Sequence, residues 1–154
     1  MGIESGANYT GGCACGAIRY DVTAEPVMAF HCQCTSCQKA TSAGHASVLL
    51  FPRAAAKITG SPKFHETPAD SGNIARRGFC TQCGSLVLGG SSGVPELLVV
   101  FAGSLDDAGR FAPQAVVFHA HAQPWDVIDP ALPTFPTIPP APERVSAAEV
   151  GDAR

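Results

Sequence analysis

The stretch His31-Cys32-Gln33-Cys34-Thr35-Ser36-Cys37 places three thiols within six residues, and the other four cysteines of the chain form two pairs away from it. A structural zinc site is usually closed by four protein ligands, whereas a catalytic zinc site uses three and keeps a fourth position for water or substrate. The seven cysteines divide into four and three. This division predicts one structural and one catalytic metal site.

The two pairs are Cys13-Ala14-Cys15 and Cys80-Thr81-Gln82-Cys83, and a glycine follows each of them, at Gly16 and Gly84. In a tight metal-binding turn the backbone amides point at the sulfur atoms, and a residue that adopts positive φ readily favours such a turn. Glycine at these positions therefore supports metal binding. We expect the four thiols to hold a structural zinc ion.

A disulfide framework is the competing interpretation of the cysteines, and three observations count against it. The number of cysteines is odd, and the stretch Met1-Gly2-Ile3-Glu4-Ser5 has neither the basic nor the apolar region of a signal peptide. Cysteines separated by one residue also pair with difficulty. Reduced thiols are typical of the cytoplasm, where we expect this protein to reside.

The composition narrows the class of protein further. A chain of 154 residues fits a single domain, and its net charge of -3 does not indicate a nucleic-acid partner. The longest apolar runs are far shorter than the roughly 20 residues that a membrane helix needs. We therefore expect small-molecule partners and no membrane association.

Short apolar or alternating segments between turn signals predict a mostly β fold. One helical turn is expected at residues 38–41, directly after the three cysteines, and another is expected to begin at 104–107, where Ser-Leu-Asp-Asp has the spacing of a capping box. Strands are expected at residues 18–23, 46–51, 56–59, 97–101 and 116–119, with one further strand at 63–66, whereas 27–30 and 86–88 are short apolar segments without an assigned structure.

The two ends of the chain differ from its centre. Residues 1–10 are expected to be a loose lead-in, and residues 11–136 to form the zinc-binding domain. Residues 137–154 are expected to be a flexible tail, because prolines recur from Pro130 onward and favour extended geometry that wraps the surface or trails away. The last residues, 143–154, have the composition of a frayed helix.

The order of motifs along the chain resembles the glutathione-dependent formaldehyde-activating enzyme family, which includes centromere protein V-like domains. The resemblance runs from Gly11 to Pro136 and includes Gly-Gly-Cys-x-Cys-Gly, Cys-x-Cys-x2-Cys, Arg-Gly-Phe-Cys-x2-Cys-Gly, Ser-Leu-Asp-Asp and Pro-Trp. It implies several short coiled antiparallel sheets, similar to the zinc-binding exchange chaperone of Rab GTPases. It also implies two zinc ions per chain, a structural one on Cys13, Cys15, Cys80 and Cys83 and a catalytic one on Cys32, Cys34 and Cys37.

The activity that the resemblance implies is addition of glutathione or a similar thiol to formaldehyde or a related aldehyde, a carbon-sulfur lyase reaction that yields S-(hydroxymethyl)glutathione. Zinc can lower the pKa of a bound thiol or polarise a carbonyl group. Three thiolates and one Zn2+ sum to a charge of -1, which weakens the metal as a Lewis acid. We therefore favour delivery of a thiolate over activation of the carbonyl group.

The sequence departs from the family at two positions beside the ligands. Gln33 stands where the family often has histidine, with His31 just before the cysteines instead, and Gln38 replaces the first of two basic residues. His31 and His45 are the nearest candidates for transferring a proton to the new hydroxyl oxygen. The alternative is that each histidine fixes its loop by hydrogen bonding.

Further residues have both a functional and a structural interpretation. Arg76 and Arg77 are candidates for binding the carboxylates of a glutathione-like substrate, although a solvated strand edge explains them equally well. His119 and His121 are expected on one face of a strand, either as a pocket wall or as an ordinary sheet face. Trp125 is expected to be a packing anchor, with a place in the lining of the site as the alternative.

A non-enzymatic binding module stapled by zinc is the alternative to an enzyme. Such a module needs only the four-cysteine site, so the additional three cysteines favour the enzyme. A homodimer is compatible with either interpretation.

Overall fold

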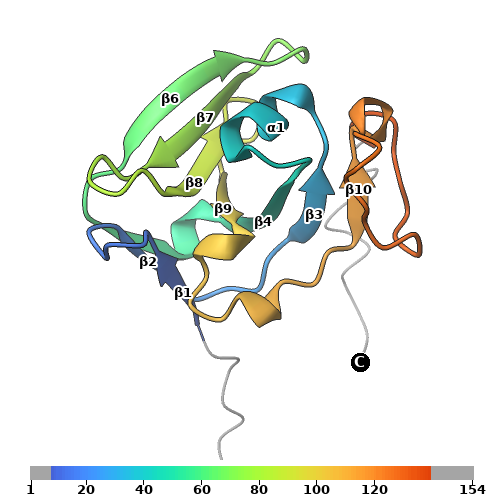
Figure 1. Ribbon diagram of the computed structural model, residues 1–154. Coiled ribbons are helices and arrows are strands. Elements are labelled where there is room, and N and C mark those ends of the chain that lie inside the picture. Colours follow the sequence, from blue (N-terminus) through green and yellow to red (C-terminus); the bar gives the residue numbers. More distant parts are fainter. Residues whose placement is uncertain (1–7, 140–154) are drawn as a thin grey trace, which may run out of the picture.

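The structure, a computed structural model, describes residues 8–139 and consists of two β-sheets, one short α-helix and four 3-10 turns (Figure 1). The smaller sheet has the strand order β1-β2-β5, with β1 at Tyr9–Gly12, β2 at Arg19–Val22 and β5 at Ala56–Thr59. The larger sheet has the order β10-β3-β4-β9-β8-β7-β6. Its strands are β3 (Met28–Cys32), β4 (Ala46–Pro52), β6 (Lys63–Pro68), β7 (Ile74–Phe79), β8 (Leu86–Ser91), β9 (Leu97–Phe101) and β10 (Ala115–Val117).

The helix α1 (Thr35–Thr41) follows β3 directly, and the 3-10 turns are η1 (Arg53–Ala55), η2 (Ala102–Ser104), η3 (Ala108–Arg110) and η4 (His119–His121). Every strand pair is antiparallel as predicted except β10 with β3, which is parallel. The exception arises because β10 reaches the edge of the sheet by a long connection from β9 instead of a hairpin. The mostly β fold is confirmed.

The hydrophobic core lies between the two sheets. Leu49 and Phe51 of β4, Leu98 and Val100 of β9, and Val22 of β2 are fully buried and belong to one cluster. Complete burial of a side chain of this size stabilises the fold by about 1.5–3 kcal/mol. The small sheet is therefore held by apolar packing against the large one, and it carries the first cysteine pair at the end of β1.

The predicted strands lie close to the observed ones. Strands β3 and β8 form where only short apolar segments were noted, and β1 and β7 were not predicted. Strand β1 begins at Tyr9, inside the segment expected to be a lead-in, and includes Gly11, where a Cβ would overlap the hydroxyl group of Tyr20 and the carbonyl oxygen of Ser104. Close backbone approach, and not a turn, therefore explains the glycine. Strand β7 was missed because its arginines interrupt the apolar pattern.

Two expectations for the second half of the chain are wrong. The strand predicted at 116–119 ends at Val117, because Phe118 adopts a left-handed conformation with φ of 56° and His119–His121 form η4. His119 and His121 therefore do not share a strand face. The helical turn predicted to begin at 104–107 lies later, as η3, and no capping box forms, because Ser104 belongs to η2 and its hydroxyl group donates to the carbonyl oxygen of Phe101 at 2.7 Å.

The proline-rich segment wraps along β10 in its described part. The amide of Val116 donates to the carbonyl oxygen of Pro133 at 2.9 Å, and Phe135 donates back to Val116 at 2.8 Å. The helix expected at 143–154 lies outside the described residues. Between residues 8 and 139, no helix has the length and hydrophobicity to cross a membrane.

Candidate metal centres

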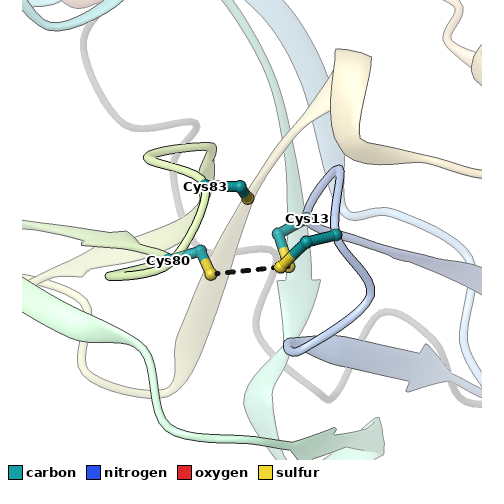
Figure 2. A group of neighbouring side chains, drawn as sticks. Cys13, Cys80 and Cys83 are labelled. Atoms are coloured by element: carbon teal, nitrogen blue, oxygen red, sulfur yellow. Dashed lines mark hydrogen bonds between the residues drawn. The ribbon is translucent and has the colours of Figure 1, made fainter.

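The first cysteine cluster joins the two sheets. Cys13 and Cys15 follow β1, Cys80 and Cys83 follow β7, and their four sulfur atoms all lie within 4.8 Å of one another (Figure 2). The Sγ atom of Cys15 is 3.6 Å from that of Cys13 and 3.7 Å from that of Cys80. The sequence prediction that these four thiols come together is confirmed.

The same backbone turn is built twice around this cluster. The amide of Cys13 donates to the carbonyl oxygen of Ile18 at 3.1 Å, and the amide of Cys80 donates to that of Ser85 at 3.0 Å. Gly16 and Gly84 have φ angles of 81° and 75°, as the turn prediction required. Each turn also aims an amide at a sulfur atom, from Ile18 to Cys13 at 3.2 Å and from Gln82 to Cys80 at 3.4 Å.

The donor set of this cluster fits a tetrahedral metal ion. Zinc bound to thiolates at about 2.3 Å separates neighbouring sulfur atoms by roughly 3.8 Å, close to the two distances observed. None of the seven cysteines forms a disulfide. Hydrogen bonds from the hydroxyl and amide groups of Ser85 lower the pKa of Cys83 to about 5, which favours the thiolate form that a metal requires.

The second cluster lies where β3 passes into α1. Cys32 is the last residue of β3, Cys34 caps the N-terminus of α1, and Cys37 lies in its first turn. Their sulfur atoms also lie within 4.8 Å of one another, and the amide of Cys37 donates to Cys34 at 3.2 Å. Cys32 is buried, whereas Cys34 and Cys37 are half-buried. We call these three residues the triad. Across residues 8–139, no fourth cysteine, histidine or carboxylate joins it.

Arg77 of β7 reaches the triad. Its Nη2 atom is 3.6 Å from the sulfur atom of Cys37. Hydrogen bonds from Cys32 and Cys37, reinforced by the charge of Arg77, lower the pKa of Cys34, while the hydrogen bond with Cys34 raises the pKa of Cys32. Three clustered sulfur atoms form a donor set that fits a thiophilic cation such as zinc.

Arg76, although adjacent in sequence, lies elsewhere. It pairs with Glu66 at 3.0 Å and its guanidinium group stacks over Phe64 at 4.3 Å. Successive residues of a strand point to opposite faces, which separates the two arginines. Arg76 is therefore solvated, although β7 is paired on both sides and is not an edge strand, and only Arg77 lies at the candidate reaction site.

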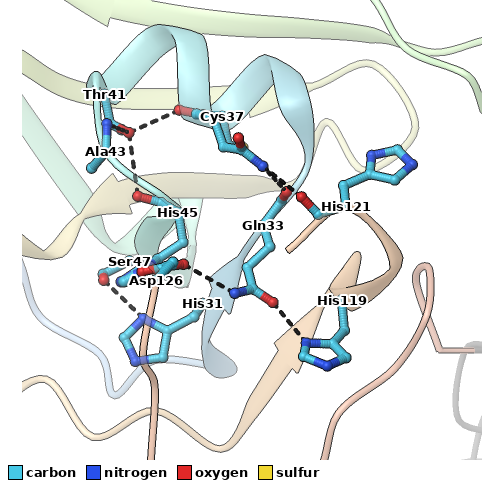
Figure 3. A network of polar contacts seen from close by, with 11 residues as sticks. His31, Gln33, Cys37, Thr41, Ala43, His45, Ser47, His119, His121 and Asp126 are labelled. Carbon is cyan, nitrogen blue, oxygen red and sulfur yellow. Dashed lines mark hydrogen bonds and ion pairs between the residues drawn. The ribbon is translucent and has the colours of Figure 1, made fainter. Parts of the chain in front are cut away.

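Gln33, which lies between two triad cysteines, is the centre of a buried polar network (Figure 3). Its side chain is 1% exposed, donates to the carboxylate of Asp126 at 3.0 Å, and accepts from Nδ1 of His119 at 2.9 Å. The same carboxylate lies 2.9 Å from Nδ1 of His45. The departure from the family's histidine thus places an amide that can donate to one partner and accept from another.

Gln38 has a related role on α1. Its side-chain amide donates to the carbonyl oxygen of Gln33 at 2.7 Å and to that of His121 at 2.9 Å, and its own oxygen accepts from Gln123 at 3.2 Å. These bonds tie α1 to the segment that follows β10. A basic residue at this position would lack the acceptor that Gln123 uses.

The structure places His31 and His45 next to each other, with ring centroids 4.5 Å apart, and not at the triad. The Nδ1 atom of His31 lies 2.9 Å from the hydroxyl group of Ser47. Because His31 precedes Cys32 in β3, their side chains point to opposite faces of the sheet. Burial and the neighbouring His45 lower the pKa of His31. This geometry favours the loop-fixing interpretation over proton transfer for both histidines.

Asp126 anchors the segment after η4, and this role was not predicted from the sequence. The packing role predicted for Trp125 is wrong. Trp125 is 65% exposed, whereas the side chain of Asp126 is 9% exposed. Gly44 makes room for the aspartate, since a Cβ there would overlap its carboxylate. A lone acidic residue within the apolar stretch 124–128 was the available signal.

Two surface hollows lie beside the salt bridge between Arg19 and Asp106. The smaller, about 190 Å³, borders Tyr9 and Arg110, and the larger, about 510 Å³, borders Cys13. Neither is lined by a triad cysteine. The candidate reaction site at the triad is therefore separate from both hollows.

Comparison with known proteins agrees with this architecture. A crystal structure of a Rhodobacter sphaeroides protein superimposes with a TM-score of 0.51 at 21% sequence identity, covering 64% of this chain and 88% of that one. This likeness shows the fold alone. No functionally curated protein matches the sequence.

A family model described as glutathione-dependent formaldehyde-activating enzyme matches residues 8–121. The matched region contains all seven cysteines, both arginines of β7 and the whole of η4. The chain therefore belongs to the glutathione-dependent formaldehyde-activating enzyme family.

Proposed function

We propose that this protein is a zinc-dependent enzyme of the carbon-sulfur lyase type, which adds glutathione or a similar thiol to formaldehyde or a related aldehyde. The observation that carries the proposal is the triad, a cluster of three thiols without a fourth protein ligand among residues 8–139, beside a separate cluster of four. Membership of the family supports formaldehyde and glutathione as the substrates.

In this proposal Cys13, Cys15, Cys80 and Cys83 hold a structural zinc ion, and the triad holds a catalytic one. When bound to the triad, zinc would supply thiolate character to an incoming thiol and, to a smaller extent, polarise the aldehyde. Three thiolates and one Zn2+ have a net charge of -1, which makes the metal a weak Lewis acid. This favours delivery of a thiolate over polarisation of the aldehyde.

The chain's own residues prepare the site for this chemistry. The amide of Cys37 and the guanidinium group of Arg77 stabilise negative charge on the triad sulfurs. Gln33 and Gln38 fix the loop that carries the cysteines, because both are hydrogen-bonded to segments far along the chain. The ligand positions are thereby held before substrate arrives, which lowers the cost of ordering them during the reaction.

The balance of the reaction is simple. The sulfur of the thiol forms a bond with the carbon of formaldehyde, the π electrons of the carbonyl group move to its oxygen, and that oxygen receives the proton lost by the thiol. Cys34 and Cys37 are half-buried, so the reacting atoms lie close to solvent. Water carries the proton from the thiol to the new hydroxyl oxygen. We assign positioning roles to His31 and His45.

We further propose that the protein acts in the cytoplasm. A triad of unpaired thiols requires a reducing compartment, and glutathione keeps cytoplasmic thiols reduced.

The first experiment counts zinc ions per chain in reduced, purified protein before and after a mild chelator, with circular dichroism recorded in parallel. We expect two zinc ions, one of which leaves without unfolding and returns more slowly when a thiol competes. A single zinc that cannot be removed, together with triad thiols that react freely with an alkylating agent, would instead identify a zinc-stapled binding module.

The second experiment measures the reaction itself. Thiols add to formaldehyde without an enzyme, so the measurement is exchange between free and thiol-bound 13C-formaldehyde by NMR. Wild-type protein should accelerate exchange, Cys34→Ala should remove the acceleration, and Glu66→Gln, on the far face of the sheet, should preserve it. Equal rates for wild type and Cys34→Ala would exclude the proposed reaction.

A further inference from the structure

Arg77 is a half-buried cation whose hydrogen bond is to sulfur and not to a carboxylate. Two other arginines of the described chain, Arg19 and Arg76, pair with Asp106 and Glu66. Within residues 8–139, no carboxylate lies within salt-bridge distance of Arg77, and its guanidinium group instead donates to Cys37 at 3.6 Å. A charge removed from water requires a counter-charge. The triad is the group that can provide it.

The position of Arg77 is fixed by the sheet. It lies in the middle of β7, opposite His65 of β6 and Gly89 of β8. Gly78, the next residue, is buried, and a Cβ there would crowd the ring of Phe64 and the side chain of Leu88. Because β7 is paired on both edges, its backbone has little freedom to move the guanidinium group away from Cys37.

The contact between Arg77 and Cys37 changes the net charge of the triad. The change matters because the proposed function places a metal ion and a thiol substrate at the triad, and the inference rests on that function. Three thiolates and a divalent metal have a net charge of -1. An incoming thiolate would make the net charge -2 if no positive group lay nearby. With the guanidinium group included, the totals are 0 and -1. At a contact of this length in a partly buried site, such a difference is far larger than at a solvent-exposed ion pair.

We propose that Arg77 is the positioning counter-ion of the triad, which strengthens metal binding there and allows the site to accept an anionic thiol, whatever else that thiol carries. The role differs from binding the carboxylates of a glutathione-like substrate. A counter-ion acts on every thiolate, whereas a carboxylate contact acts only on thiols that possess one.

The test compares wild type with Arg77→Gln, Arg77→Lys and Arg76→Gln. The last is a matched control, because it removes the same charge one residue away on the opposite face of the strand. Metal affinity is measured by competition between cobalt-loaded protein and a chromophoric chelator. Thiol affinity is then measured from the change in cobalt absorption on titration with 2-mercaptoethanol and, separately, with glutathione.

We expect Arg77→Gln to weaken metal binding at the triad about 10–100-fold, the range found when a group supporting a metal ligand is removed, and to leave the four-cysteine site unchanged. Both thiols should lose affinity by a similar factor. Arg77→Lys should be intermediate, since it keeps the charge and loses the planar donor geometry. Arg76→Gln should match wild type.

Three results would overturn the proposal. Equal metal affinities for Arg77→Gln and Arg76→Gln would show that the contact has no electrostatic role. Loss of glutathione binding alone, with 2-mercaptoethanol unaffected, would assign Arg77 to a substrate carboxylate. A wild-type protein that binds one cobalt ion would remove the proposed function and this inference together, whereas the first two results leave the proposed function intact. If Arg77→Gln does not fold, Arg77→Met replaces it in the comparison with Arg76→Gln, because methionine also removes the charge and keeps an unbranched apolar stem.

Discussion

The carboxylate of Asp126 accepts a hydrogen bond of 3.0 Å from the side chain of Gln33, although 93 residues separate them in the chain. The same carboxylate holds His45, which lies between α1 and β4. One buried acid thus links the loop that carries the triad to the segment that follows β10. The candidate site is therefore shaped by a contact between two segments that lie far apart in the chain.

Replacing Asp126 with alanine should destabilise the protein by about 2–4 kcal/mol, because Gln33 and His45 each lose a partner in a buried position. Urea denaturation monitored by circular dichroism measures this change. The exposed loop residue Asp70 provides the control, and Asp70→Ala should change stability by less than about 0.5 kcal/mol. Equal effects of the two substitutions would show that the network contributes nothing to stability.

Gly44→Ala should also destabilise the protein, since the added Cβ would overlap the carboxylate of Asp126. The two positions should couple. In the double variant Gly44→Ala/Asp126→Gly the loss should be smaller than the sum of the single losses, by about 0.5 kcal/mol or more, because glycine removes both the carboxylate and the Cβ atom of Asp126 that the new Cβ would overlap. A double-mutant cycle in urea tests this, and strict additivity would contradict the contact.

The two cysteine clusters should respond differently to loss of a ligand. Cys80→Ala should leave the domain largely unfolded at 25 °C, because the four-cysteine site joins the two sheets and the free energy of metal binding there becomes folding free energy. Cys34→Ala should yield a folded protein with one metal ion fewer. Thermal melts and metal content distinguish the variants, and a Cys34→Ala protein that melts as readily as Cys80→Ala would contradict the assignment.

Tyr20 should make stability fall at alkaline pH. Burial raises the pKa of its hydroxyl group to about 12, above the value near 10 of an unfolded chain. A raised pKa means that the unfolded state releases its proton first. The contribution is therefore complete below about pH 10 and is lost as pH rises toward 12.

Urea denaturation between pH 9 and pH 11.5 measures this slope. Tyr20→Phe should be less stable than wild type at pH 9, because the hydrogen bond of 2.8 Å to Ser104 is lost, and its stability should vary less with pH above 10. Parallel curves for the two proteins would show that another group causes the alkaline loss.

The parts of the structure set by local chemistry could be predicted from the sequence. The spacing Cys13-x-Cys15-Gly16 and Cys80-x2-Cys83-Gly84 predicted the four-cysteine cluster and both turns, because each glycine has the positive φ that the turn demands. The apolar segments of β4 and β9 were equally clear, since they are central strands whose residues are all buried or half-buried.

The features that could not be predicted depend on which face of a strand a residue occupies and on contacts with residues far away in the sequence. One interpretation placed Arg76 and Arg77 on a strand edge, but the sequence indicated neither the neighbours of this strand nor the face that each arginine occupies, and these decide which of them faces the triad. Phe118 has a left-handed backbone conformation, which ends the strand before His119 and His121. This conformation is typical of glycine, so a phenylalanine gave no signal for it. The partnership of Gln33 with Asp126 arises from tertiary packing, which no local spacing encodes.

The separation of 93 residues between Gln33 and Asp126 also sets an order of events during synthesis. At roughly 5–20 residues per second, a ribosome needs about 5–20 s to travel from one to the other. Cys80 and Cys83 emerge within this interval, so the staple between the two sheets can close while the triad loop still lacks its final support. In newly made chains the triad loop therefore lacks its hydrogen bond to Asp126 for several seconds, and all four ligands of the four-cysteine site are synthesised before that bond can form.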